Sequence, residues 1–238
     1  MRPLIAANWK MHGDMDWTDK PSQFEELLPA SKREGVEVLI CPPFPLIAPL
    51  KDAADKASIH IGAQNCHAEV KGAHTGEVNA ELLASVGAKY IIVGHSERRA
   101  QGESHADVKA KAEAVHRAGL IPIICVGETL TQRKAARTHT IVKNMLLGSM
   151  PEDSENVVIA YEPVWAIGTG ETASAAEIVE VHMLIRELIG PNIRILYGGS
   201  VKPTNAEEIL SIPNVNGALI GGAGLEMTSL AEIARFAI

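Results

Sequence analysis

Three side chains that can do acid–base chemistry follow short apolar runs in this sequence. Lys10, His95 and Glu162 each come within three residues of the end of such a run. A carboxylate can accept a proton, an imidazole can donate a hydrogen bond, and an ammonium group can stabilise negative charge. Together these groups suit acid–base catalysis on an anionic substrate.

Glu162 lies in apolar surroundings, between Tyr161 and the segment Pro163–Trp165. Burial disfavours the charged form of a carboxyl group, so we expect a raised pKa and a stronger base. The loop tip that follows, residues 166–170, consists mainly of small residues and is expected to close as a lid over a bound ligand. A glutamate in a structural ion pair is the alternative.

His95 follows Gly94 and precedes Ser96 and Glu97. The N–H groups at the start of a nearby helix disfavour the imidazolium form, so we expect a neutral ring that donates a hydrogen bond. The alternative is a buried histidine with a purely structural role. Its position at the end of an apolar run, like that of Glu162, favours a functional role.

Two glycine-rich turns, Gly198–Ser200 and Gly221–Gly224, indicate a phosphate site. Glycine lets backbone N–H groups approach a ligand closely, and a helix that begins just beyond presents its positive end. Tight turns without a ligand are the alternative. We expect Lys10 to lie beside these turns and Asn8 to point the same way, because side chains alternate along a strand.

Apolar runs alternate with helical patterns along the whole chain. The runs are Leu4–Ala7, Val36–Cys41, Ile59–Ala63, Tyr90–Val93, Ile121–Val126, Val157–Tyr161, Ile193–Tyr197 and Ala218–Ile220. Most are apolar on both faces, which is typical of strands in a buried parallel sheet. Helices are expected over Ala106–Ala118, Ala175–Ile189 and Asn205–Leu210.

This alternation predicts an α/β fold, a closed (β/α)₈ TIM barrel that forms a single domain over residues 1–238. Function in such a barrel sits at the carboxyl ends of the strands, where the polar residues gather. A doubly wound open sheet is the alternative. It is disfavoured because no Gly-x-Gly-x-x-Gly follows the first run.

Composition and charge exclude several classes of function. The net charge of −7 disfavours a nucleic-acid partner, and no apolar run is long enough to cross a membrane. The three cysteines lie far apart and match no zinc spacing, so we expect reduced thiols in a cytoplasmic protein and no metal site.

Four segments resemble the motifs of the triosephosphate isomerase family, in the same order. They are Ala7–Met11, Val93–Arg99, Ala160–Gly170 and Tyr197–Val201. The resemblance covers essentially the whole chain. It implies an aldose–ketose isomerase of glycolysis and gluconeogenesis that interconverts dihydroxyacetone phosphate and D-glyceraldehyde 3-phosphate through an enediolate, without a cofactor.

The resemblance also implies a role for each site residue. Glu162 would transfer the proton between carbons, and His95 would polarise the carbonyl. Asn8 and Lys10 would hold the substrate, and Glu97 would organise this corner of the site. The phosphate would be bound by Gly168, Ser200, Gly221 and Gly222.

The segment Gln64–Val78 is long for a connection between a strand and a helix, which usually has about 2–6 residues. It resembles the family's projecting loop, which docks into the neighbouring subunit and brings Thr75 near the partner's Asn8 and Lys10. The resemblance therefore implies a homodimer. A monomer with a mobile surface loop is the alternative.

Three other functions stay open at this level. A related isomerase could act on a four-carbon sugar phosphate with the same residues, a barrel could bind phosphate without catalysis, and a lyase could form a Schiff base. The sequence also departs from the family at two places in the expected phosphate site and lid. Gly224 stands where serine is frequent, and Glu171 stands where lysine or arginine is common.

Overall fold

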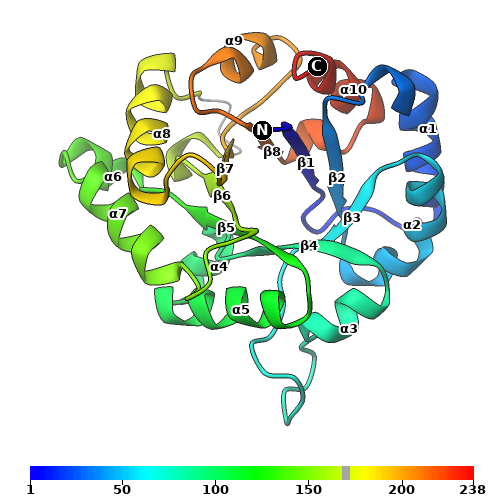
Figure 1. Cartoon of the computed structure of the whole chain (residues 1–238), viewed down its shortest axis with the longest axis horizontal. Helices are drawn as coiled ribbons and strands as arrows, with labels where there is room; N and C mark the ends of the chain where they lie inside the picture. Colours follow the sequence, from blue (N-terminus) through cyan, green and yellow to red (C-terminus); the bar gives the residue numbers. More distant parts are fainter. Residues whose placement is uncertain (168–171) are drawn as a thin grey trace.

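The computed structural model describes residues 1–167 and 172–238, in which the strands close into a parallel barrel (Figure 1). Each strand pairs with the next, and β8 pairs with β1 to complete the ring. The strands are β1 Leu4–Asn8, β2 Glu37–Cys41, β3 His60–Ala63, β4 Ala88–Val93, β5 Ile121–Val126, β6 Val158–Tyr161, β7 Arg194–Tyr197 and β8 Gly217–Ile220. The expected (β/α)₈ barrel is confirmed. The first and last residues of each apolar run differ from those of the corresponding strand by at most two residues.

Helices surround the barrel on its outside (Figure 1). They are α1 Lys20–Leu27, α2 Phe44–Lys56, α3 Ala80–Ser85, α4 Ser96–Ala100, α5 His105–Arg117, α6 Leu130–Lys134, α7 Thr138–Ser149, α8 Ala175–Ile189, α9 Ala206–Ser211 and α10 Met227–Arg235. The prediction for α8 is confirmed at both ends, because Ser174 caps its first turn and Gly190 ends it with a positive φ of 75°. Those for α5 and α9 are displaced by one residue.

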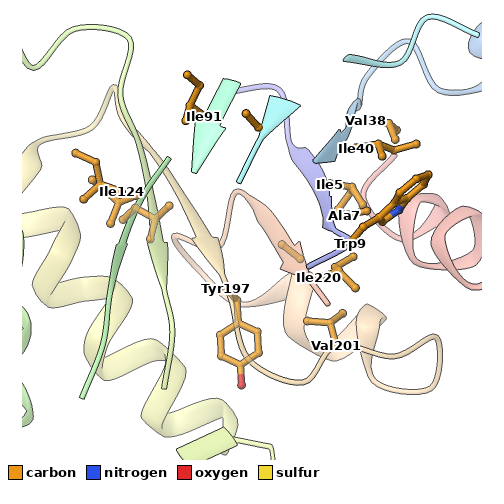
Figure 2. Packing of buried hydrophobic residues seen from close by; sticks show 14 of the residues in the cluster. Ile5, Ala7, Trp9, Val38, Ile40, Ile91, Ile124, Tyr197, Val201 and Ile220 are labelled. Carbon is orange, nitrogen blue, oxygen red and sulfur yellow. The ribbon is translucent and has the colours of Figure 1, made fainter. Parts of the chain in front are cut away.

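The strands bury side chains on both faces, which explains their nearly continuous apolar sequences. Along β1, Leu4 and Ala6 join the cluster inside the barrel. Ile5 and Ala7 join the cluster between the barrel and the helices, part of which is seen in Figure 2. The interior cluster also contains Leu39, Cys41, Tyr90, Ile92, Ile123, Cys125, Val158, Ala160, Leu196 and Leu219. The packed interior leaves the strand ends as the place where a site can form.

A polar cluster lies at the amino ends of the strands, away from the residues expected in the site. Glu37 accepts hydrogen bonds from the Tyr90 hydroxyl at 2.7 Å and from Arg194 Nη1 at 3.2 Å. Burial alone would raise the pKa of Glu37, but Tyr90 and Arg194 together lower it below its ordinary value. This cluster gives the barrel a half-buried carboxylate with structural partners, away from the expected site.

His182 on α8 makes the stability of the fold sensitive to acid. The side chain is fully buried, its Nδ1 lies 3.1 Å from the Asn214 carbonyl oxygen, and its Nε2 has no hydrogen-bond partner among the described residues. Burial lowers the pKa of His182 from 6.5 to about 4. Between these values the unfolded chain binds more protons than the folded one, so the free energy of unfolding decreases as the pH falls.

We therefore expect His182 to contribute a loss of about 2 kcal/mol in the free energy of unfolding between pH 7.5 and pH 5. Urea unfolding at the two pH values measures it. His182→Gln should shrink the difference between the two pH values, and His12→Gln, at an exposed position, should leave it intact. An unchanged difference in His182→Gln would show that other groups cause the acid sensitivity.

Candidate active site

A cavity of about 710 Å³ opens at the carboxyl ends of the strands. It is lined by residues from opposite ends of the chain, and it contains seven of the residues expected from the sequence: Asn8, Lys10, His95, Glu162, Ser200, Gly221 and Gly222. The fold thus brings together a carboxylate, an imidazole, an ammonium group and two glycine-rich turns.

Two of the expected residues lie elsewhere, and a third is not described. Glu97 lines a neighbouring cavity, where it contacts Lys10. Thr75 is exposed on the long loop between β3 and α3, which projects from the barrel at the bottom of Figure 1. Gly168 lies outside the described residues, as do residues 169–170 of the expected lid tip and Glu171.

Glu162 and His95 form the centre of the cavity. Glu162 directly follows β6, and its Oε1 lies 3.0 Å from Nε2 of His95. Its Oε2 accepts the Ser96 backbone N–H at 2.9 Å. Both side chains are almost completely buried, so each interacts with the other in a medium that screens charge weakly.

The expectation of a raised pKa for Glu162 is wrong for the structure as it stands. Burial raises the pKa of this carboxyl group. His95 and the Ser96 N–H lower the pKa by more than burial raises it, so the pKa lies below its ordinary value. The sequence revealed the apolar surroundings of Glu162 but not the two donors, which come from another strand end. The carboxylate is therefore held in its ionised form.

The hydrogen bonds of His95 favour the expected neutral ring. His95 caps the first turn of α4, and its Nδ1 accepts the Glu97 N–H at 3.2 Å. This assigns the proton to Nε2, which then donates to Glu162. Burial lowers the pKa of His95, but the charge of Glu162 raises it above its ordinary value. Protonation would nevertheless remove the Nδ1 acceptor, so we assign the neutral tautomer in this geometry.

Lys10 lies beyond the end of β1, and the expectation that it continues the strand is wrong. Its φ is +51°, in the left-handed region that non-glycine residues rarely adopt. Three contacts hold it there, one of which is the hydrogen bond from Gln64 Nε2 to its carbonyl oxygen at 2.8 Å. Its N–H donates to Asn8 Oδ1 at 3.0 Å, and its Nζ lies 2.6 Å from Glu97 Oε1. Asn8 and Lys10 still line the same cavity, because this turn replaces the strand geometry.

Two glycines make room for Glu162. A Cβ added to Gly127 would lie 1.7 Å from the Glu162 carbonyl oxygen, and one added to Gly198 would lie 2.9 Å from Glu162 Cγ. Side chains at these positions would push the carboxylate out of place, since such contacts are far below van der Waals distance. The glycines after β5 and β7 therefore set the position of the residue after β6.

The glycine-rich turns form one wall of the cavity. Ser200 donates its hydroxyl to the Ala166 carbonyl oxygen at 2.8 Å, which ties this wall to the first residue of the expected lid tip. The turn after β8 is a short 3₁₀ helix, η4 (Gly222–Gly224), with Gly221 before it. Backbone N–H groups in such turns bind anions, so this wall suits a phosphate.

A buried glutamate to which the sequence assigned no role anchors the chain before the lid. Glu128 is fully buried and accepts hydrogen bonds from the Tyr161 hydroxyl, Trp165 Nε1 and Arg133 Nη1, at 3.1–3.2 Å. Its position directly after Gly127, at the end of a strand like Glu162, was the available signal. The network fixes the 3₁₀ turn η3 (Val164–Ala166), which leads into residues 168–171.

Other kinds of site find little support. Within residues 1–167 and 172–238, no group of three or more His, Cys, Asp or Glu side chains could hold a metal ion. Among the same residues no helix is both long and apolar enough to span a membrane. Cys41, Cys66 and Cys125 are free and buried.

The strands form a closed parallel barrel, and at their carboxyl ends a carboxylate contacts an imidazole beside glycine-rich turns. These features define an acid–base enzyme of the (β/α)₈-barrel class. The sequence profile of the family described as Triosephosphate isomerase matches residues 3–237. The chain belongs to the triosephosphate isomerase family.

Relatives and solved structures agree with this assignment. The chain is 49% identical to the triosephosphate isomerase of Afipia carboxidovorans, over 99% of this chain and 97% of that one. It is 48% identical to that of Bradyrhizobium diazoefficiens over the same shares. A crystal structure of triosephosphate isomerase from Bartonella henselae matches with a TM-score of 0.91 and 41% identity, covering 99% of both chains.

Proposed function

We propose that this chain interconverts dihydroxyacetone phosphate and D-glyceraldehyde 3-phosphate, with Glu162 as the base that moves the proton between C1 and C2. The observation that carries the proposal is the direct contact of Glu162 with His95, in a cavity that the glycine-rich turns after β7 and β8 also line. This reaction has its place in glycolysis and gluconeogenesis, and we propose the cytoplasm as its location.

Substrate binding would change the basicity of Glu162. The carboxylate must leave His95 and the Ser96 N–H before it can reach a carbon acid, because both of its oxygens are engaged. Loss of these donors removes the interactions that lower its pKa, while burial, which raises it, remains. Glu162 would therefore become a stronger base only when the substrate is in place.

The proton balance assigns a part to each side chain. Glu162 takes the proton from C1 of dihydroxyacetone phosphate, and the electron pair moves to O2 to give an enediolate. Lys10 and Asn8 stabilise its negative charge. Neutral His95 donates Nε2–H to O2 and takes the O1 proton, and Glu162 returns its proton to C2. The phosphate is bound by Ser200, Gly221 and Gly222, with Gly168 from the lid.

The proposed function is tested by assaying purified protein with both triose phosphates and, in parallel, with erythrulose phosphates. Turnover of the triose phosphates, with solvent deuterium appearing on carbon, is the expected result. Turnover of the four-carbon sugars alone would identify the related isomerase. Phosphate binding without turnover would identify a binding barrel, and inactivation by borohydride in the presence of substrate would identify a Schiff-base lyase.

We also propose that the active form is a homodimer in which each subunit is a single domain over residues 1–238. The loop between β3 and α3 stands away from its own barrel (Figure 1) and exposes 45% of Val70. Close to Lys10, a second cavity of about 450 Å³ is lined by Phe44 and by Met11, which is 94% exposed. A projecting loop with an exposed valine and a cavity beside an exposed methionine on one chain suit a second copy, related by a twofold axis.

In this arrangement, Thr75 of one subunit would lie near Asn8 and Lys10 of the other. The neighbour would then add support to Lys10, whose backbone has a positive φ and is held within its own chain by Asn8 and Gln64. Replacing residues 67–76 by a short turn should give a monomer with low activity, measured by sedimentation and initial rates. A loop variant that stays dimeric, or a monomer with full activity, would contradict the proposal.

A further inference from the structure

We infer that Trp9 and Lys20 are positioning residues for the phosphate-binding turn after β8, because they hold two consecutive backbone carbonyl groups of that turn. The inference rests on the proposed function, in which this turn binds the substrate phosphate. Neither residue lines the cavity, so both would act through the backbone of residues 221–225.

The two contacts come from the first strand–helix unit and reach across the seam of the barrel. Trp9 Nε1 donates to the Gly224 carbonyl oxygen at 3.1 Å, and Lys20 Nζ donates to the Leu225 carbonyl oxygen at 2.6 Å. Trp9 is completely buried, and Lys20 is only 8% exposed. A lysine so deeply buried needs a partner for its charge, and the carbonyl supplies part of it.

The internal hydrogen bonds of the turn explain why these carbonyls matter. Gly224 N–H donates to the Gly221 carbonyl and Leu225 N–H to the Gly222 carbonyl, at 2.8 and 3.1 Å. This leaves the N–H groups of Gly222 and Ala223, which line the cavity, for an anion. Because peptide units are planar, fixing the next two carbonyls also fixes the orientation of this end of the turn.

Close packing adds to the restraint. A Cβ added to Gly224 would lie 2.8 Å from Ala7 Cβ, so the turn rests directly on β1. Figure 2 shows Ala7 and Trp9 together in the buried cluster that also contains Ile220, the last residue of β8.

The two donors are themselves held in place by Trp17. Its ring meets the Trp9 ring edge-on, with centroids 5.2 Å apart and an interplanar angle of 80°. Lys20 Nζ lies 4.1 Å from the centroid of the Trp17 ring, which provides a cation–π contact for the buried charge. Trp9, Trp17 and Lys20 thus form one packed unit behind the turn.

The test compares substrates with and without a phosphate group. Trp9→Phe keeps an aromatic ring but removes the N–H, and Lys20→Met keeps the chain length but removes the charge. For each variant, kcat/KM for triose phosphate relative to kcat/KM for D-glyceraldehyde should fall about tenfold, equivalent to about 1.4 kcal/mol. The inhibition constant for inorganic phosphate should rise by the same factor, with the loss in KM and not in kcat.

Arg235→Met is the matched control. Arg235 Nη2 donates to the Leu27 carbonyl oxygen at 2.8 Å and links α10 to α1 in the same corner of the barrel, without contacting the turn. This variant should leave both ratios unchanged. Equal losses with D-glyceraldehyde and triose phosphate in Trp9→Phe and Lys20→Met would show a purely structural role and overturn the inference.

The inference and the proposed function can fail separately. If the wild-type protein isomerises no triose phosphate, the proposed function fails. Calorimetry with inorganic phosphate then still measures the dissociation constant in the wild type and in both variants. An unchanged constant in the variants, or no phosphate binding by the wild type, would overturn the inference. If Trp9→Phe or Lys20→Met does not fold, the remaining variant alone is compared with the wild type.

Discussion

Replacement of Glu162 by aspartate is expected to lower kcat by about 10²-fold or more and to change KM little. The shorter side chain moves the carboxylate by about 1 Å, and a misplacement of that size can remove two orders of magnitude in rate. Gly127 and Gly198 fix the backbone and Cγ of Glu162, so the protein cannot shift the residue forward to compensate. Initial rates with both triose phosphates measure the effect.

Glu37→Asp is the control, because it shortens a half-buried, ion-paired glutamate by the same methylene at the opposite end of the barrel. It should weaken the contacts with Tyr90 and Arg194 and lower the temperature of unfolding, while kcat stays near the wild-type value. If Glu162→Asp kept wild-type turnover, or if Glu37→Asp lost as much, Glu162 would not be the base.

The fold could be predicted from the sequence because its signals are local. Strands buried on both faces produce short apolar runs such as Ile121–Val126. The strand β5 begins and ends at the two residues predicted from this run. The helix α8 has its cap and its stop in the sequence, at Ser174 and Gly190. The order of strands in a (β/α)₈ barrel then follows from the chain itself, since each strand pairs with the next.

The membership of the site could also be predicted, because residues that follow parallel strands must meet at one end of the barrel. The pairing inside the site could not. The donors to Glu162 come from His95 and Ser96, far away in the sequence, and they reverse the direction of its pKa shift. No pattern in the sequence shows which side chains will touch across the barrel.

The backbone geometry at Lys10 could not be predicted from the sequence either. The alternation of side chains predicted correctly that Asn8 and Lys10 share a cavity, but for the wrong reason, because Lys10 has left the strand. Trp9 lies between them in the sequence and is completely buried. Its hydrogen bond to Gly224, across 215 residues, depends on the closure of β8 on β1.

Replacement of Lys10 by alanine is expected to raise KM for the triose phosphates by about 10²-fold and to lower kcat as well. The protein carries a net charge of −7, so little else attracts an anionic substrate. The variant also leaves Glu97 without its ammonium partner, and the freed carboxylate lies 3.7 Å from His95 Nδ1. Negative charge that develops on the enediolate would then be repelled where it should be stabilised.

Lys202→Ala separates this specific role from the general charge of the cavity. Lys202 lines the same cavity but is exposed at its rim, where solvent and salt screen its charge. We expect KM to rise by less than about threefold in this variant. Steady-state rates at two ionic strengths measure both effects. A KM for Lys10→Ala within about threefold of the wild-type value would show that the glycine-rich turns bind the phosphate without Lys10. Equal increases of KM in Lys10→Ala and Lys202→Ala would show that Lys10 contributes only its charge, as Lys202 does.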